Sequence, residues 1–242
     1  MSAANLRDWW RSGESPTMRI EEVIEFMHLT HPRTIFVKSL RQRAVLLDMG
    51  AGNGSLQVFR TWLRPTRTDI RIYAYAMERG QAFDAYDRYE LGEWPDRKPD
   101  FDGEQFDAIL TSHFIEHTPD AREVVKWAAG RLKQEGRLYV EWPSPNSKGL
   151  PSLSEVRGWG IPILISNYHD DATHRDLPER HVVIEAIQDS GMVLEQEGLI
   201  RNPLVEQEAL AHLKRGVRDE FLMQTAYWSH TRWAQFVVAS RP

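Results

Sequence analysis

The most constraining feature of this sequence is a glycine-rich bend that follows a short apolar run at residues 44–48. The run ends in the acid Asp48, and glycines then stand at every second position, at Gly50, Gly52 and Gly54. Glycine adopts positive φ readily and leaves room for a ligand that a Cβ would block. A strand, a bend and a helix in this order present free backbone N–H groups. A plain tight turn needs fewer glycines, so we predict that this bend holds a ligand.

Apolar runs of strand length alternate with stretches of helical periodicity through the first 142 residues. We expect strands at 44–48, 70–77, 106–111 and 137–142, and helices at 56–63 and 118–132, the second ended by Gly136. Such alternation is typical of a doubly wound parallel sheet with helical crossovers, in which ligands bind at the carboxyl ends of the strands.

The two flanking parts of the chain have a different character. Within segment 1–43, Ser15 and Pro16 form a helix start signal ahead of an apolar stripe from Ile20 to Met27. Segment 143–181 is rich in Pro, Gly, Ser, Asp and His and lacks periodicity, so we expect an insertion that covers the substrate. A helix at 181–190, with Gly191 after it, and strands at 192–200 and 232–239 are expected to complete one domain over 1–242.

Composition narrows the class of partner. The 30 basic and 35 acidic residues give a net charge of −5, which argues against nucleic acid as a partner. There are no cysteines, which rules out disulfides and thiolate metal sites. The chain shows no apolar run long enough for a membrane helix and no apolar signal core near its start, so we expect a cytoplasmic protein with no membrane partner. Whether it forms a homo-oligomer is left open.

Two kinds of cofactor compete for the bend. A nicotinamide fingerprint would read G-x-G-x-x-G, whereas this chain reads G-x-G-x-G with Asp48 two residues ahead. A carboxylate there repels a pyrophosphate and suits an ammonium group. Residues 48–54 resemble the first motif of the Rossmann-like, class I S-adenosylmethionine-dependent methyltransferases. That family implies a seven-stranded sheet, mostly parallel with an antiparallel last strand, and helices on both faces.

Further segments resemble the later motifs of the same family in the expected order. Glu78 ends the second strand, where the family's acid accepts both ribose hydroxyls. Residues 89–95 resemble the third segment and align Glu90 with the adenine-contacting acid, with Glu93 as a rival. Residues 106–117 resemble the fourth segment, and residues 131–141 resemble the turn into the fifth strand. The resemblance implies S-adenosylmethionine as cofactor, S-adenosylhomocysteine as product, and a cofactor site made of Asp48, Gly50, Ala51, Gly52, Asn53, Gly54, Glu78, Glu90, Leu91 and Ser112.

Histidines near the fourth strand are candidates for chemistry. Transfer to a hydroxyl needs a base for the acceptor proton, and a histidine suits this task near neutral pH. We expect His113 to be that base, with His117 and His174 as further candidates; each could instead be structural or solvated. A metal held by His113, Glu116 and His117 is a less favoured alternative.

The sequence therefore predicts a methyltransferase that acts on a small molecule. A hydroxyl oxygen is the favoured acceptor, because the Asn/Asp-Pro-Pro-Tyr motif of many amino-group methyltransferases is absent after the fourth strand, where Ser112, His113 and Phe114 stand. The alternatives are an N-methyltransferase of a small molecule and a non-catalytic S-adenosylmethionine-binding regulator or partner protein. The identity of the acceptor is not readable from the sequence.

Overall fold

The computed structural model describes residues 3–11, 15–217 and 219–242. The chain divides into two compact units. The sheet unit comprises Arg33–Trp142, Pro178–Gly198 and Phe236–Pro242, and the helical unit comprises Met1–Pro32, Pro143–Leu177 and Leu199–Gln235. The single-domain organisation expected from the sequence stays a prediction.

The central element is a seven-stranded sheet with the strand order β3-β2-β1-β4-β5-β7-β6. β1 pairs in parallel with β2 and β4, β2 pairs in parallel with β3, and β4 pairs in parallel with β5. The sheet is mostly parallel with an antiparallel last strand, which confirms the fold class. The strands are β1 (Val45–Met49), β2 (Arg71–Ala76), β3 (Arg88–Leu91), β4 (Phe106–Ser112), β5 (Leu132–Pro143), β6 (Val193–Leu199) and β7 (Ala234–Ser240).

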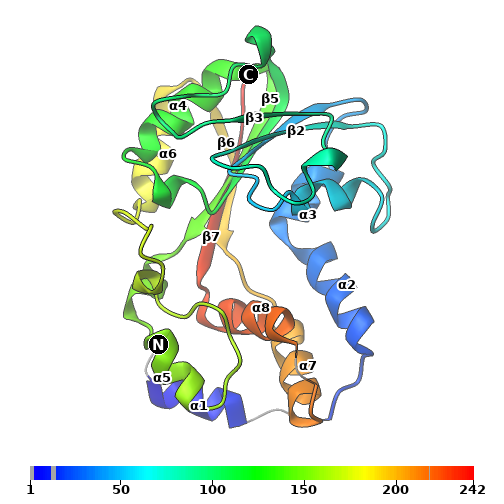
Figure 1. Cartoon of the computed structure of the whole chain (residues 1–242), viewed down its shortest axis with the longest axis vertical. Coiled ribbons are helices and arrows are strands. Elements are labelled where there is room, and N and C mark those ends of the chain that lie inside the picture. Colours follow the sequence, from blue (N-terminus) through cyan, green and yellow to red (C-terminus); the bar gives the residue numbers. More distant parts are fainter. Residues whose placement is uncertain (1–2, 12–14, 218) are drawn as a thin grey trace. The chain divides into compact units, whose positions relative to one another are not determined.

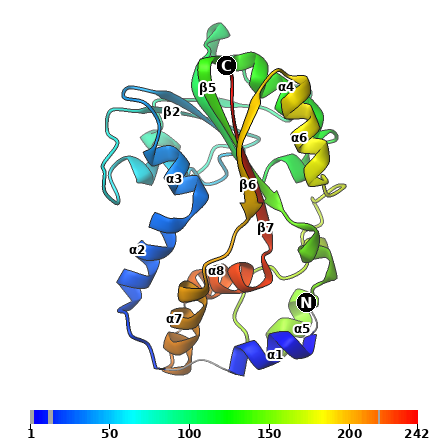
Figure 2. The ribbon, with the colours of Figure 1, turned by 180° about the vertical axis from the view of Figure 1, so that it is seen from behind.

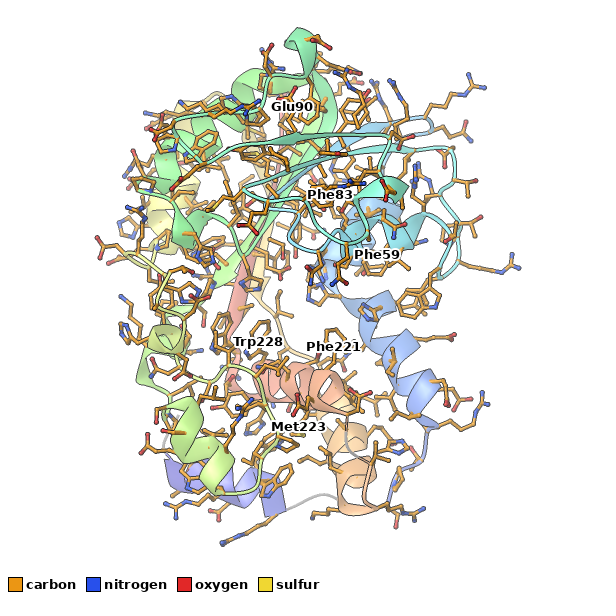
Figure 3. All side chains as sticks on the ribbon, in the orientation of Figure 1. Phe59, Phe83, Glu90, Phe221, Met223 and Trp228 are labelled. Atoms are coloured by element: carbon orange, nitrogen blue, oxygen red, sulfur yellow. The ribbon has the colours of Figure 1, made fainter. Side chains whose placement is uncertain are left out.

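Helices cover both faces of the sheet, as expected (Figures 1 and 2). α4 (Ala121–Arg131) and α6 (Arg180–Asp189) lie side by side on one face, and α3 (Pro32–Lys38) lies on the other. Asp120 caps α4 by accepting a hydrogen bond from the Arg122 amide at 2.8 Å. A buried apolar core that includes Phe59 and Phe83, marked in Figure 3, fills the sheet unit. Burial of this apolar surface is the main term that stabilises the unit.

The helical unit has its own apolar core, in which α7 packs against α2 and α8. Met223 of α8 is fully buried in this core and Trp228 packs against it (Figure 3). None of the described helices is long and apolar enough to cross a membrane, and the cytoplasmic location stays a prediction. The helices are α1 (Ala3–Arg11), α2 (Ile20–Thr30), α5 (Leu153–Gly158), α7 (Pro203–Lys214) and α8 (Glu220–Thr231).

The N-terminal helix was placed too early by the sequence signal. α2 begins at Ile20 behind Arg19, not behind Ser15. The amides of Thr17 and Met18 donate to the buried carboxylate of Glu208 at 2.9 Å and 3.0 Å. A side chain from α7 thus satisfies both amides at the place where the helix was expected to begin.

The predicted end of the helix over 118–132 was also wrong. α4 ends at Arg131, and Leu132 is already extended and pairs with Phe106 in the sheet. Gly136 therefore lies within β5 and ends no helix. The register between β4 and β5 shifts after Phe106. The strand pairing of Leu132 outcompetes its place in the helical apolar stripe.

The segment after the glycine bend forms a short 3₁₀ helix, η1 (Ser55–Arg60), in place of the expected helix over 56–63. The Lys38 ammonium lies 2.5–2.9 Å from four carbonyl oxygens of the following turn, which share its three N–H donors. These carbonyls belong to Phe59, Trp62, Leu63 and Pro65. A lysine that binds the carbonyls in this way ends the helix, since no amide further along is needed to satisfy them.

Segment 143–181 carries more structure than its composition indicates. It contains two 3₁₀ helices, η5 (Pro145–Gly149) and η6 (Tyr168–Asp170), in addition to α5. Asp170 Oδ2 accepts hydrogen bonds from the amides of Ser166 and Asn167 at 2.9 Å and 2.6 Å. Local capping of this kind orders the segment without apolar periodicity. Its role as a cover over the substrate stays a prediction.

The buried carboxylate of Asp107 gives a stability prediction for the sheet unit. It accepts a hydrogen bond from the Val45 amide at 2.7 Å, lies 3.1 Å from Lys133 Nζ and pairs with Arg41. Asp107→Asn should lower the free energy of unfolding by about 1–3 kcal/mol, because an amide replaces one acceptor oxygen in a buried site. Urea unfolding measures this. The control Asp102→Asn, whose side chain is 87% exposed, should change little. Equal effects of both variants would contradict the role of Asp107.

Candidate active site at the carboxyl ends of the strands

The glycine bend follows β1 and depends on positive φ at three positions. Gly50, Gly52 and Gly54 have φ of +78°, +51° and +82°. The amides of Gly50 and Ala51 both donate to the carbonyl of Tyr75 at the end of β2, at 2.9 Å and 3.1 Å. The bend is thus fastened to the neighbouring strand, and its conformation is one that other residues rarely adopt.

The three glycines differ in how much room a Cβ would have, and this difference indicates where a ligand can bind. A Cβ on Gly50 would lie 2.8 Å from Phe114, and one on Gly54 would lie 3.0 Å from Phe83. A Cβ on Gly52 would meet no atom closer than 4.0 Å. Gly50 and Gly54 are therefore needed for packing, whereas Gly52 borders open space that a ligand can use.

The loop after β2 interlocks with the same bend. A Cβ on Gly80 would lie only 2.2 Å from the carbonyl oxygen of Gly52, so no other residue fits there. The amide of Ala82 donates to the carbonyl of Asn53 at 3.0 Å. This close approach fixes the loop that carries Glu78 against the bend that carries Gly52.

Asp48 lies at the end of β1 beside the bend and is almost fully buried. Its Oδ2 accepts a hydrogen bond from the Tyr86 hydroxyl at 2.6 Å. Burial raises the pKa of Asp48 to about 6, although the Tyr86 hydrogen bond and the positive charge of Arg33 both act to lower it. At neutral pH the group is therefore an ionised carboxylate inside the protein, which favours a cationic ligand.

The other acids expected at the cofactor site differ in exposure and in hydrogen bonding. Glu78 follows β2 and is exposed, as is the rival acid Glu93. Glu90, in β3, accepts hydrogen bonds from the amides of Asp100 and Phe101 at 2.8 Å and 2.7 Å, so its carboxylate also holds a neighbouring turn. Leu91 ends β3 and pairs with Ala76 of β2.

His113 lies directly after β4 between two buried carboxylates. Its Nδ1 is 3.1 Å from Glu116 Oε1, and its Nε2 is 3.2 Å from Glu141 Oε1. Burial acts to lower the pKa of His113, but the two carboxylates outweigh it and raise the pKa to about 9. His113 is therefore an imidazolium at neutral pH, with both ring nitrogens directed at acids.

Ser112 connects this cluster to a second cation. Its hydroxyl donates to Glu141 Oε1 at 3.1 Å and accepts from Arg33 Nη1 at 3.1 Å. The Tyr139 hydroxyl donates to Glu141 Oε2 at 2.5 Å. Charges of alternating sign thus lie along the carboxyl ends of β4 and β5, and each buried carboxylate has a cation or a donor against it.

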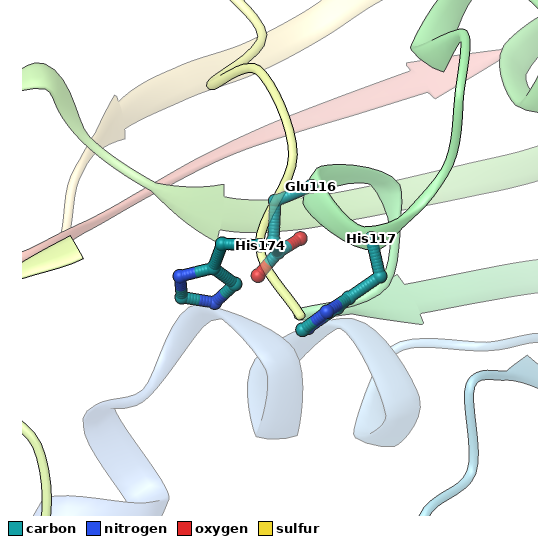
Figure 4. A group of neighbouring side chains, drawn as sticks. All are labelled: Glu116, His117 and His174. Carbon is teal, nitrogen blue, oxygen red and sulfur yellow. The ribbon is translucent and has the colours of Figure 1, made fainter. Parts of the chain in front are cut away.

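The remaining two histidines belong to different units. His117 and Glu116 lie on the 3₁₀ turn η4 (Ile115–His117), drawn in Figure 4, with ligand atoms within 4.8 Å of each other. His174 belongs to the helical unit, where its ring stacks on Tyr168 at 4.4 Å. Its Nδ1 is 2.6 Å from the Tyr168 carbonyl oxygen. A carbonyl oxygen accepts only from N–H, so Nδ1 carries a proton, and Nε2 lies 3.9 Å from Asp171 Oδ2.

Sequence reasoning missed four residues of the sheet unit's cluster. Arg33, Tyr86 and Glu141 contact Ser112, Asp48 and His113, respectively, and Tyr139 donates to Glu141. Glu141 stood in the segment compared with the fifth strand, where an acid near a strand end was a usable signal. Arg33 and Tyr86 follow no spacing rule, because tertiary contacts alone bring them to the site.

The charged His113 gives a pH dependence with a definite sign. Its pKa is raised from 6.5 to about 9, so the stability that it contributes is fully present below pH 6.5 and is lost as pH rises through 9. In Glu141→Gln one carboxylate partner is removed, so the loss of stability should be smaller and should end at lower pH. Urea unfolding between pH 6 and 10 measures both slopes.

The matched control for this pH series is Glu195→Gln. Glu195 pairs with Arg137 at 2.6 Å and touches no histidine among its described contacts. This variant should keep the wild-type slope. A Glu141→Gln slope equal to that of the wild type would contradict the assignment of charge to His113.

Comparison with known proteins identifies the family of this chain. A family described as "Methyltransferase domain" matches residues 21–197. The ubiquinone biosynthesis O-methyltransferase of Idiomarina loihiensis is 26% identical over an alignment of 171 residues, and the match covers 65% of this chain and 66% of that protein. The match thus spans slightly less than two thirds of that relative.

Solved structures share the fold. The cyclopropane synthase MmaA2 from Mycobacterium tuberculosis superposes with a TM-score of 0.56 at 16% identity, covering 97% of this chain and 94% of that one. Coclaurine N-methyltransferase, solved with N-methylheliamine and S-adenosylhomocysteine, gives a TM-score of 0.56 at 12% identity and covers 94% of this chain and 75% of that one. The strand order, the glycine bend and the family match lead to one conclusion: this chain belongs to the S-adenosylmethionine-dependent methyltransferase family.

Proposed function

We propose that this protein transfers the methyl group of S-adenosylmethionine to a hydroxyl oxygen of a small molecule. The observation that carries the proposal is the open space at Gly52 beside the buried, ionised carboxylate of Asp48. S-adenosylmethionine, when bound, supplies a methyl group on a positively charged sulfur. The protein then needs to hold donor and acceptor in line, which is mainly a matter of position.

We assign the donor site to the residues around the glycine bend. Asp48 suits the ammonium group, because a buried carboxylate requires a positive partner. Glu78, exposed at the loop braced by Gly80, suits the ribose hydroxyls. We assign the adenine of S-adenosylmethionine to β3, where Glu90 and Leu91 lie. The other residues of the proposed site are Gly50, Ala51, Gly52, Asn53, Gly54 and Ser112.

Two observations favour oxygen as the acceptor atom. The similar protein from Idiomarina loihiensis is named as an O-methyltransferase. The segment after β4 reads Ser112, His113 and Phe114, without the motif of many amino-group methyltransferases. N-methylation of a small molecule and non-catalytic binding of S-adenosylmethionine remain the alternative functions.

The proton of the acceptor hydroxyl needs a base with a free lone pair. An imidazolium between Glu116 and Glu141 has none, so we propose that His113 orders and charges the site and removes no proton. In this proposal His113 has a different role from the base that the sequence predicts. His117 lies on the turn η4 next to Glu116, in the same unit as Asp48 and the glycine bend. We therefore propose His117 as the base, and His174 is the alternative that the sequence offers.

Binding of the donor is tested at Gly52. Gly52→Val should abolish binding of S-adenosylhomocysteine in calorimetry, because its side chain fills the space at the bend. Gly103→Val is the matched control, since Gly103 also has positive φ, +78°, and no atom within 4 Å of a Cβ. The control carries the same kind of backbone strain and should bind normally. Normal binding by Gly52→Val would refute the donor site.

Transfer and its base are tested together with radiolabelled S-adenosylmethionine and a panel of phenols, catechols and amines. We expect label in a hydroxyl compound. His117→Gln should then slow transfer by about 10²–10⁴-fold with unchanged binding of S-adenosylhomocysteine. His174→Gln is the parallel variant. A full rate in His117→Gln together with a slow His174→Gln would move the base to His174, label only in amines would establish N-methylation, and no label at all would favour a binding protein.

A further inference from the structure

We propose that Tyr86 is a positioning residue of the donor site, whose hydroxyl holds one oxygen of Asp48 and keeps this carboxylate ionised for the ammonium group of the donor. The proposal rests on the proposed function, since it assigns the donor's amino-acid end to Asp48. It goes further, because Tyr86 lies outside every segment that resembles a family motif and controls the charge of the site from a separate loop.

The position of Tyr86 is fixed by the structure around it. It follows the 3₁₀ helix η2 (Phe83–Ala85), and its amide donates to the Phe83 carbonyl at 3.1 Å. The side chain is buried, and its ring packs on Phe83 with centroids 5.6 Å apart. A Cβ on Gly54 would lie 3.1 Å from the ring, so the ring also touches the glycine bend. The hydroxyl thus reaches Asp48 from a rigid support.

The contact leaves one oxygen of Asp48 for a ligand. Tyr86 occupies Oδ2 at 2.6 Å, and no other hydrogen bond to Asp48 occurs among residues 3–11, 15–217 and 219–242. The hydrogen bond to Oδ2 therefore fixes the orientation of the carboxylate, and Oδ1 can accept from a ligand. A carboxylate with one oxygen held is preorganised, which reduces the loss of side-chain freedom on binding.

The Tyr86 hydroxyl can act on Asp48 only as a hydrogen-bond donor. Burial beside Asp48 raises the pKa of Tyr86, so its hydroxyl stays protonated and always donates. A donor stabilises the ionised carboxylate and opposes the effect of burial on the pKa of Asp48. Arg33 is the other charged group that acts on Asp48 in the same direction. Removal of the hydroxyl leaves Arg33 alone against burial.

The test is the pH dependence of S-adenosylhomocysteine binding by calorimetry between pH 5.5 and 8.5. Wild-type affinity should fall as pH drops through about 6, where Asp48 takes up a proton. In Tyr86→Phe this fall should begin at least about one pH unit higher, the usual size of a lost hydrogen bond to a charge. The variant should therefore bind several-fold more weakly at pH 6 and approach the wild type at pH 8.5.

Two further variants isolate the effect. In Tyr73→Phe another buried tyrosine loses its hydrogen bond to a carboxylate, that of Glu104 at 3.0 Å, and the pH profile of binding should not move. In Asp48→Asn the pH dependence should vanish, both alone and together with Tyr86→Phe. Thermal melting establishes that each variant is folded.

Each outcome decides between the claims. If the wild type does not bind S-adenosylhomocysteine, the proposed function fails and the inference fails with it. If the wild type binds and the profile of Tyr86→Phe is unshifted, only the role of Tyr86 is overturned. A folded Tyr86→Phe that loses the same affinity at every pH would assign Tyr86 to packing of the bend, which also overturns the inference.

Discussion

The site depends on one close contact between two backbones, that of Gly80 against the carbonyl oxygen of Gly52. A Cβ at Gly80 would lie 2.2 Å from this oxygen, so the loop after β2 can approach the bend only with glycine there. The hydrogen bond from Ala82 to Asn53 holds the same two segments together. Because this loop leads to Tyr86, the contact sets the place of Tyr86 as well as that of the bend. A backbone contact of this kind is rigid, which a site that works by orientation requires.

A second constraint comes from buried charge. Glu116 and Glu141 are almost fully buried, and an isolated carboxylate there would cost several kcal/mol. His113 between them and Arg33 on Ser112 supply the opposite charge. The cost of burial is offset only while every member is in place, so the cluster specifies one arrangement of the ends of β4 and β5. His113 contributes to this arrangement through its charge.

The sequence predicted those parts of the molecule that depend on local rules. The alternation of β1, β2, β4 and β5 with helices and the glycine bend follow from periodicity and backbone conformation within short windows. Features set by distant side chains were wrong or missing. Glu208 moves the start of α2, Lys38 ends the helix after the bend, and Arg33 and Tyr86 reach the site from elsewhere in the sequence. No spacing rule relates these residues to their partners, so no pattern could indicate them.

The charges of the sheet unit also explain why this bend suits a sulfonium cofactor better than a dinucleotide. Asp48, Glu116 and Glu141 carry negative charge, and Arg33 and His113 carry positive charge, so the cluster retains one negative charge when all are ionised. A pyrophosphate would add charge of the same sign beside a buried carboxylate, and its binding would be opposed. S-adenosylmethionine carries a sulfonium, an ammonium and a carboxylate, which sum to one positive charge. In the proposed donor site the charges of cofactor and cluster therefore cancel, and the ammonium group is the positive partner that the buried carboxylate of Asp48 requires.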